Sequence, residues 1–211
     1  MISNVFDVNF RKVNKFIVFI IQMNKFFILI LLFSSLFARA QNYFQQEVNY
    51  VINVKLDDKN HFLNADLTLE YVNNSPDTLH EIYIHLWPNA YKDNETAYAK
   101  QQLELRRSRF YFAEKPARGY IDSLNFKVNG ESVKWEFDAK HIDICKISLK
   151  EALPPGMRIN ICTPFRVKLP NSFSRLGHWG QQYQITQWYP KPAVYDKNGW
   201  HPMPYLDMGE F

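Results

Sequence analysis

The chain has 211 residues, 46% hydrophobic and 22% charged, with a formal net charge of +4. This length is enough for one domain with a substantial core. The positive charge resides in residues 1–40, and residues 41–211 hold 20 basic and 20 acidic side chains. We therefore expect no nucleic-acid partner, because such a partner needs a basic face. With only seven glycines, the composition also argues against a glycine-rich phosphate loop.

The N-terminal region contains a complete export signal. Met23 is soon followed by a lysine and then by the apolar run Phe26–Phe37. The small-x-small triplet Ala38–Ala40 comes next, directly ahead of Gln41. These are the three parts of a secretory signal peptide. We predict a signal peptide at 23–40, export to the periplasm or the extracellular space, and no stable membrane anchor after cleavage.

Residues 1–22 precede that signal and contain a second apolar run, Phe16–Ile21. The simplest explanation is that translation begins at Met23 and that 1–22 is a mis-assigned upstream extension. The alternative is an uncleaved signal anchor that uses both runs. Polar residues interrupt such an anchor, and the later run is shorter than the roughly 20 residues that span a bilayer.

Most of the remaining chain has the pattern of short strands. Two-residue alternation, or β-branched and aromatic enrichment, marks seven segments. They are Val48–Leu56, Phe62–Val72, Leu79–Trp87, Tyr120–Val128, Val133–Phe137, Ile142–Leu149 and Met157–Leu169. Turn residues such as Asn129-Gly130 and Pro154–Gly156 separate them. Short strands with frequent turns predict an all-β fold, either an antiparallel curved sheet or a β-sandwich.

One segment, Glu95–Arg107, is instead rich in Ala, Gln, Leu, Glu and Arg. These residues favour a helix, and Asn94 is a suitable cap for its first turn. The sequence therefore predicts one short helical insertion in the β-fold.

Two cysteines, Cys145 and Cys162, flank the turn Leu153–Gly156. In an oxidising compartment they could bridge across a hairpin. Strand parity argues against a bridge, because Cys145 shares a face with Ile147 whereas Cys162 alternates with Ile161. The sequence leaves the pairing open.

His80 and His85 come close to the His-Glu-x-x-His motif of zinc peptidases, but they stand five residues apart instead of four. On a helix a spacing of five separates two side chains by about 140°, so they do not share a metal. The alternating Ile82 and Ile84 indicate a strand, which would send the two histidines to opposite faces. We predict no metal site here and no cofactor site in the chain.

The last thirty residues combine large aromatic rings with prolines, which predicts strands that end in a shaped loop. Several strings in this stretch and upstream resemble the N-terminal domain of aminopeptidase N-like zinc metallopeptidases (gluzincins), most closely their secreted bacterial branch. They are Tyr83–Tyr91, Arg118–Ser123, Gln182–Gln184, Trp188–Pro190, Ala193–Asp196 and Gly199-Trp200. The resemblance rests on their order and spacing and covers roughly Gln46–Phe211.

The resemblance implies a saddle-like β-domain, residues 41–211, that borders a substrate cleft. In that family a Gly-x-Met-Glu-Asn strand binds the substrate amine, His-Glu-x-x-His plus a later Glu binds zinc, and a Tyr stabilises the oxyanion. All of these lie C-terminal to the resembling domain, and neither motif occurs in this sequence. We therefore expect a fragment, incomplete at its C-terminus and inactive alone, with zinc bound only in a separate catalytic domain.

The resemblance also assigns a substrate-binding residue. Gln184 stands where the family has a Gln or Glu that helps to bind the substrate amine, and Gln182 lies one pleat away on the same face of the predicted strand. An amide carbonyl can accept a hydrogen bond from an ammonium group. A peptide partner is expected only together with a catalytic domain. On the residues alone, a glutamine that satisfies a strand edge is an equally good interpretation.

A different class of function is a freestanding periplasmic β-sandwich. Such a module would bind a peptide or a glycan through an aromatic surface around Trp179, Trp188 and Trp200. The strings Tyr83–Tyr91 and Gln182–Phe211 favour the peptidase domain, because a binding module has no reason to keep both.

Overall fold

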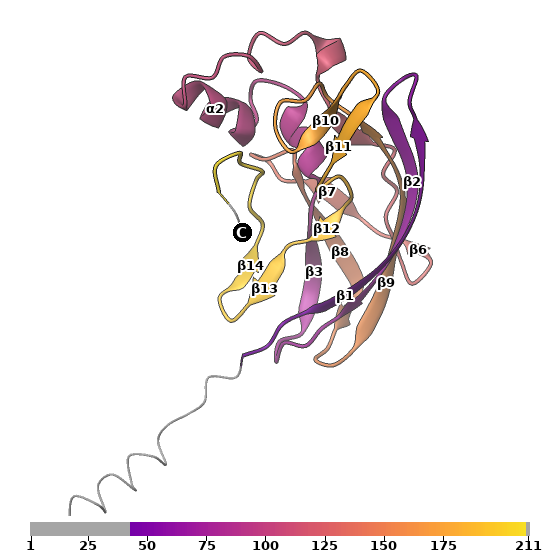
Figure 1. The fold of residues 1–211 in the computed structure, drawn as a ribbon. Coiled ribbons are helices and arrows are strands. Elements are labelled where there is room, and N and C mark those ends of the chain that lie inside the picture. Colours follow the sequence, from indigo (N-terminus) through magenta and orange to yellow (C-terminus); the bar gives the residue numbers. More distant parts are fainter. Residues whose placement is uncertain (1–42, 210–211) are drawn as a thin grey trace, which may run out of the picture. The chain divides into compact units, whose positions relative to one another are not determined.

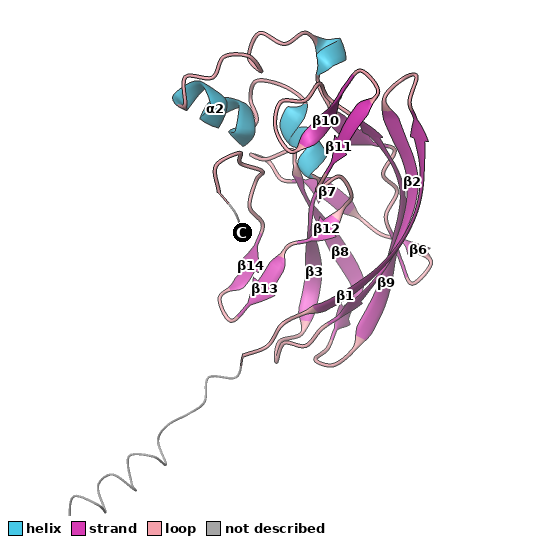
Figure 2. Ribbon diagram, in the orientation of Figure 1, coloured by secondary structure: helices cyan, strands magenta, loops and turns pink. Residues whose placement is uncertain are grey.

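The computed structural model describes residues 43–209 (Figure 1). The predicted upstream extension, 1–22, and signal peptide, 23–40, lie outside the described residues. Antiparallel strands dominate the described part, with one α-helix, so the predicted all-β class with a short helical insertion is confirmed (Figure 2). No helix within 43–209 is long and apolar enough to cross a membrane.

The larger sheet has six strands. Its path runs from β1 (Glu47–Asp57) through β2 (Phe62–Val72) and β9 (Arg158–Lys168) to β5 (Lys127–Val128) and β6 (Glu131–Ser132), and β4 (Tyr120–Asp122) also pairs with β9. β1 and β2 form a hairpin that pairs Glu47 with Val72 at its open end and Asp57 with Phe62 at its turn. β1 therefore lies at the edge of the sheet, where it has a single partner.

The smaller sheet has four strands. Its order is β12 (Lys191–Pro192), β3 (Leu79–His85), β8 (Ile144–Leu153) and β7 (Trp135–Phe137). Figure 1 shows β3 and β8 facing the curved β1–β2–β9 strands. The two sheets thus form the two layers of a sandwich.

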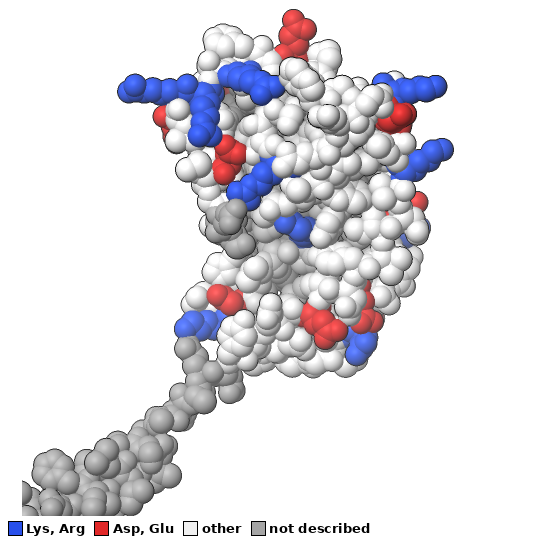
Figure 3. Space-filling view, viewed as in Figure 1, with Lys and Arg blue, Asp and Glu red and all other residues white. Residues whose placement is uncertain are grey.

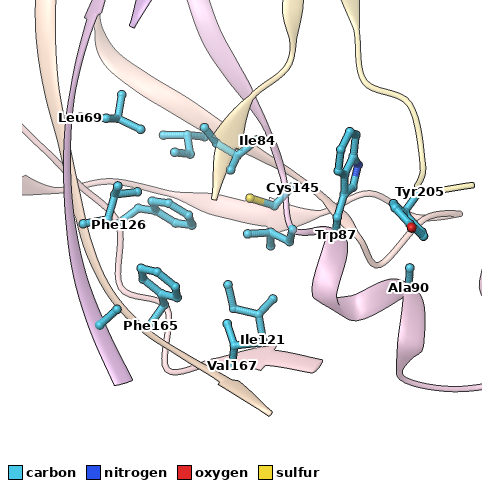
Figure 4. Packing of buried hydrophobic residues seen from close by; sticks show 14 of the residues in the cluster. Leu69, Ile84, Trp87, Ala90, Ile121, Phe126, Cys145, Phe165, Val167 and Tyr205 are labelled. Carbon is cyan, nitrogen blue, oxygen red and sulfur yellow. The ribbon is translucent and has the colours of Figure 1, made fainter. Parts of the chain in front are cut away.

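The core lies between these layers and follows the two-residue alternation of the strands. In β2 the odd-numbered residues from Leu63 to Tyr71 are buried, and in β9 those from Ile159 to Val167 are buried. Ile84 and other side chains of the smaller sheet meet them from the opposite layer (Figure 4). Full burial of one such aliphatic side chain contributes about 1.5–3 kcal/mol, so this interface is the main source of stability.

The turn Leu153–Gly156 connects the two layers. β8 ends at Leu153 in the smaller sheet, and β9 starts at Arg158 in the larger one. The hairpin considered for the two cysteines is therefore wrong. Cys145 is buried in the core, Cys162 is half-buried, and both thiols are free.

Two predicted strands end earlier than the pattern indicates. Tyr120–Val128 is divided into β4 and β5, because Ser123 adopts a positive φ of 61° that no strand accommodates. β3 ends at His85, and Trp87 begins the 3₁₀ helix η1 (Trp87–Tyr91), which has a proline in its first turn. Proline fits there because the first helical residues need no amide donor.

The helix α2 (Ala97–Glu104) is shorter than predicted, and its cap differs. The Thr96 hydroxyl accepts a hydrogen bond from the Ala99 amide at 3.2 Å, as an N-cap residue does. Asn94 is not the cap, because its side-chain oxygen accepts instead from the Arg118 guanidinium at 2.8 Å. A second 3₁₀ helix, η2 (Lys115–Ala117), follows.

The C-terminal part adds two small hairpins. β10 (Leu176–Trp179) pairs with β11 (Gln182–Ile185), and β13 (Val194–Asp196) pairs with β14 (Gly199–His201). Between them β12 joins the edge of the smaller sheet beside β3. The predicted strands are present in this stretch, and a loop follows the last of them after His201.

Candidate functional site

Both glutamines proposed as site residues lie on β11. Gln182 is opposite Trp179 and Gln184 is opposite Gly177 in the β10–β11 hairpin. Both glutamine side chains are exposed, whereas Tyr183 and Ile185 are half-buried on the other face. The strand alternation thus places Gln182 and Gln184 side by side on one exposed face, as their spacing predicts.

The opposite face of β11 is fixed to the β1–β2 turn. The Tyr183 hydroxyl donates a hydrogen bond to the Asp58 carbonyl at 3.1 Å and therefore accepts one from His61 Nδ1 at 2.9 Å. The His61 ring stacks on the His178 ring of β10, with centroids 3.5 Å apart. Burial lowers the pKa of His178 below its ordinary value, which favours a neutral ring in this stack.

On its other side, β10 is hydrogen-bonded to the segment 170–172. The His178 amide donates to the Pro170 carbonyl at 2.9 Å, and the His178 carbonyl accepts from the Ser172 amide at 3.1 Å. This close approach needs a glycine at 177, because a Cβ there would lie 2.8 Å from the Cα of Ser172. β10 is therefore the inner strand of the hairpin, and β11 pairs with no other described strand.

The amides of Gln182 and Gln184 make no side-chain hydrogen bond within residues 43–209. Their neighbour Gln181 differs, since its amide donates to the Asp58 carbonyl at 3.4 Å. Each free amide offers one carbonyl acceptor and two N–H donors to a ligand.

The two histidines of the near-motif lie on a strand, β3, which confirms the predicted strand Leu79–Trp87 as far as His85. His80 is exposed, and His85 is buried. Burial, and secondarily the Lys191 cation, lower the pKa of His85 to about 4, so its ring is neutral at pH 7. Within the described part of the chain, no three His, Cys, Asp or Glu side chains gather as metal ligands.

The three tryptophans proposed for an aromatic surface have different environments. Trp179 is 71% exposed. Trp188 packs against Phe165 with ring centroids 5.7 Å apart, and Trp200 packs against Tyr195 at 5.0 Å. Of the three, only Trp179 is a strongly exposed ring.

Sequence patterns did not reveal the contacts that hold this site. His61 and Tyr183 are 122 residues apart, and no pattern in the sequence links them. Gly177 was the one available signal, since a glycine inside a strand often marks close approach of another backbone segment.

No family model and no curated protein matches the sequence. Three similar solved structures are M1 zinc metallopeptidases that carry a Glu-to-Ala mutation. One from Deinococcus radiodurans is 15% identical over 61% of this chain and 22% of its own, with a TM-score of 0.36. The M1 enzyme from the same organism with a bound Tyr-Ser-Ala substrate is 14% identical over 64% of this chain and 25% of its own, with a TM-score of 0.39. A two-domain M1 enzyme with bound L-tryptophan is 15% identical over 66% of this chain and 26% of its own, with a TM-score of 0.38. The chain thus spans about a quarter of their length.

Proposed function

We propose that residues 41–211 form the N-terminal, non-catalytic domain of a secreted zinc aminopeptidase and border the substrate cleft of a catalytic domain. The observation that carries the proposal is the pair of unengaged amides, Gln182 and Gln184, on the exposed face of a hairpin held on both sides. The family resemblance gives these amides a ligand, the α-ammonium group of a peptide.

In this role Gln184 orients the substrate. Its carbonyl oxygen accepts a hydrogen bond from the substrate ammonium, and the contacts of Tyr183 fix the strand that carries it. In this proposal the zinc is bound by the catalytic domain, as the family resemblance implies. This chain would contribute to catalysis by positioning the substrate, because it borders the side of the cleft that binds the substrate amine.

A second feature supports a neighbouring domain. Tyr50, Val54 and Leu56 of β1 share a face with buried residues of β2. Their own side chains are nevertheless 37%, 49% and 39% exposed. Partly exposed apolar side chains along one face of an edge strand form a surface that another domain can cover.

Substitution of Gln184 tests the site in a reconstituted enzyme. The mature chain is combined with a catalytic domain expressed from the reading frame that follows it, and kcat/KM is measured on an aminoacyl amide. Loss of one hydrogen bond to a charged group costs about 1.5–3 kcal/mol, so Gln184→Ala should reduce kcat/KM roughly ten- to a hundredfold. Unchanged kcat/KM would remove Gln184 from the site.

Gln182→Ala is the matched comparison, because Gln182 lies on the same face of the same strand and is equally unengaged. A smaller loss than for Gln184→Ala assigns the amine contact to Gln184. Equal losses would instead indicate that both amides contact the substrate.

We also propose export with cleavage before Gln41. The positive residue, the apolar run and the small-x-small triplet from Met23 support it. N-terminal sequencing or intact mass of protein from a secreting host should give a chain that begins at or near Gln41. Retention of Phe26–Phe37 in the mature protein would contradict it.

A further inference from the structure

A separate cleft lies where the end of β3 meets β12 and the β13–β14 hairpin. It encloses about 400 Å³, and its lining includes His85, Trp87, Lys191, Val194 and Met203. Gln182 and Gln184 are not part of the lining. Sites for small molecules commonly measure about 300–1,000 Å³, so the cleft is large enough for an organic ligand.

Lys191 provides the positive charge of this cleft. Its ammonium lies 3.5 Å from the centroid of the Trp87 ring, a cation–π contact. Within the described residues no carboxylate forms a salt bridge with it. Burial lowers the pKa of Lys191 to about 8. The cleft thus contains a partly desolvated cation. Its partner, the Trp87 ring, carries no negative charge that would neutralise it.

His85 adds a hydrogen-bond donor beside this cation. Its ring stacks on Trp87 with centroids 4.9 Å apart. The Met203 amide donates to His85 Nε2 at 3.2 Å, so the proton of the neutral ring resides on Nδ1. That N–H has no hydrogen-bond partner within residues 43–209.

The acid in the lining is already engaged. The Asp196 carboxylate accepts hydrogen bonds from His201 Nε2 at 2.8 Å and from the Asn198 amide at 2.7 Å. These bonds lower the pKa of Asp196, that from His201 most. Asp196 therefore remains paired within its own hairpin and does not neutralise Lys191.

The remaining walls are apolar. Val194 is 64% exposed and Met203 is 41% exposed, while Tyr50 and Pro192 complete this side of the lining. Figure 3 shows one face of the molecule, on which residues other than Lys, Arg, Asp and Glu predominate and basic side chains gather beside α2. A ligand for the cleft therefore needs one anionic group and an apolar body.

We propose that the cleft between β3, β12 and β13–β14 binds an organic anion with a single carboxylate on an apolar body. The carboxylate accepts hydrogen bonds from Lys191 and from His85 Nδ1–H, and the apolar body packs against Val194 and Met203. A small aryl acid and the C-terminal carboxylate of a peptide that ends in an apolar residue share this chemistry.

Calorimetric titration of the purified mature chain tests the charge requirement. The probes are 3-phenylpropanoate and 3-phenylpropanamide, which have the same shape and differ in charge. We expect saturable one-to-one binding of the acid and at least about tenfold weaker binding of the amide, because a charged hydrogen bond is lost. Equal affinities, or no binding of the acid at millimolar concentration, would overturn the proposal.

A second pair of probes distinguishes a small aryl acid from a peptide C-terminus as the source of the carboxylate. These are N-acetyl-Gly-Gly-Phe with a free or an amidated C-terminus. Binding of the free-acid peptide as tightly as 3-phenylpropanoate indicates a chain end as the ligand, and binding of the small acid alone indicates a metabolite-sized ligand. None of these probes has a free amine, so their failure would leave the role proposed for Gln184 untouched.

Variants assign the binding to this cleft. Lys191→Gln should weaken 3-phenylpropanoate binding about ten- to a hundredfold, and Lys191→Arg should restore part of it. Lys197→Gln is the matched control, because Lys197 is exposed in the adjacent turn and is not in the lining. Val194→Glu changes an exposed position without disturbing the core and should repel the carboxylate. Wild-type affinity in both Lys191→Gln and Val194→Glu would place the ligand elsewhere.

Discussion

Single residues show how burial sets the chemistry of this surface. His85 and Lys191 both contact the Trp87 ring. Desolvation is the main cause that lowers the pKa of each. The charge of Lys191 is retained near neutral pH, whereas His85 is neutral. One ring thus contacts both a cation and a neutral donor within the same cleft.

The buried His85 makes stability dependent on pH. Its pKa falls from an ordinary 6.5 to about 4 in the folded chain, so the unfolded chain binds this proton more readily. The free energy of unfolding should therefore fall as the pH drops from about 6.5 to 4, by about 3 kcal/mol at most. Urea unfolding at several pH values measures this fall.

His85→Gln should flatten that dependence. Glutamine does not titrate, and its side-chain carbonyl can still accept from the Met203 amide. His80→Gln is the control, because His80 is exposed on the same strand and should leave the dependence unchanged. A His85→Gln protein with the full wild-type fall between pH 6.5 and 4 would show that His85 is not its source.

At the scale of secondary-structure elements, alternation in the sequence located strands well where one face is buried. β2 was predicted with its observed bounds because its odd-numbered residues are all buried. The pattern failed where backbone conformation decides the boundary, as at Ser123 with its positive φ. It also placed Gln182 and Gln184 on one face, since that requires only the two-residue period.

Gly177 tests the support of the β10–β11 hairpin. A Cβ at this position would lie 2.8 Å from Ser172 Cα and 2.9 Å from the Pro170 carbonyl oxygen. Gly177→Ala should therefore displace the segment that hydrogen-bonds to His178 and cost about 1–3 kcal/mol. Thermal unfolding and hydrogen exchange of the His178 amide measure the two effects.

Gln182→Ala is the comparison on the facing strand. This exposed side chain has no hydrogen-bond partner among the described residues, so the change should alter stability by less than about 0.5 kcal/mol. Wild-type stability and wild-type exchange in Gly177→Ala would mean that the 170–172 segment does not hold the hairpin.

At the scale of the whole molecule, pairing between distant strands lies beyond what local patterns contain. β8 and β9 are consecutive and a turn signal separates them, yet they belong to different sheets. The contact of His61 with Tyr183 and that of Lys191 with Trp87 join segments about 100 residues apart or more. Alternation reports which face of a strand is buried, not which strand lies beside it.

The most direct test of the central proposal is the dependence of peptidase activity on this domain. Hydrolysis of an aminoacyl 4-nitroanilide is measured for the mature chain alone, for the polypeptide encoded by the following reading frame alone, and for the two together. We expect activity only when both are present, and its loss on chelation of zinc. Chelator-resistant activity of the mature chain alone, or full activity of the second polypeptide without it, would contradict the proposal.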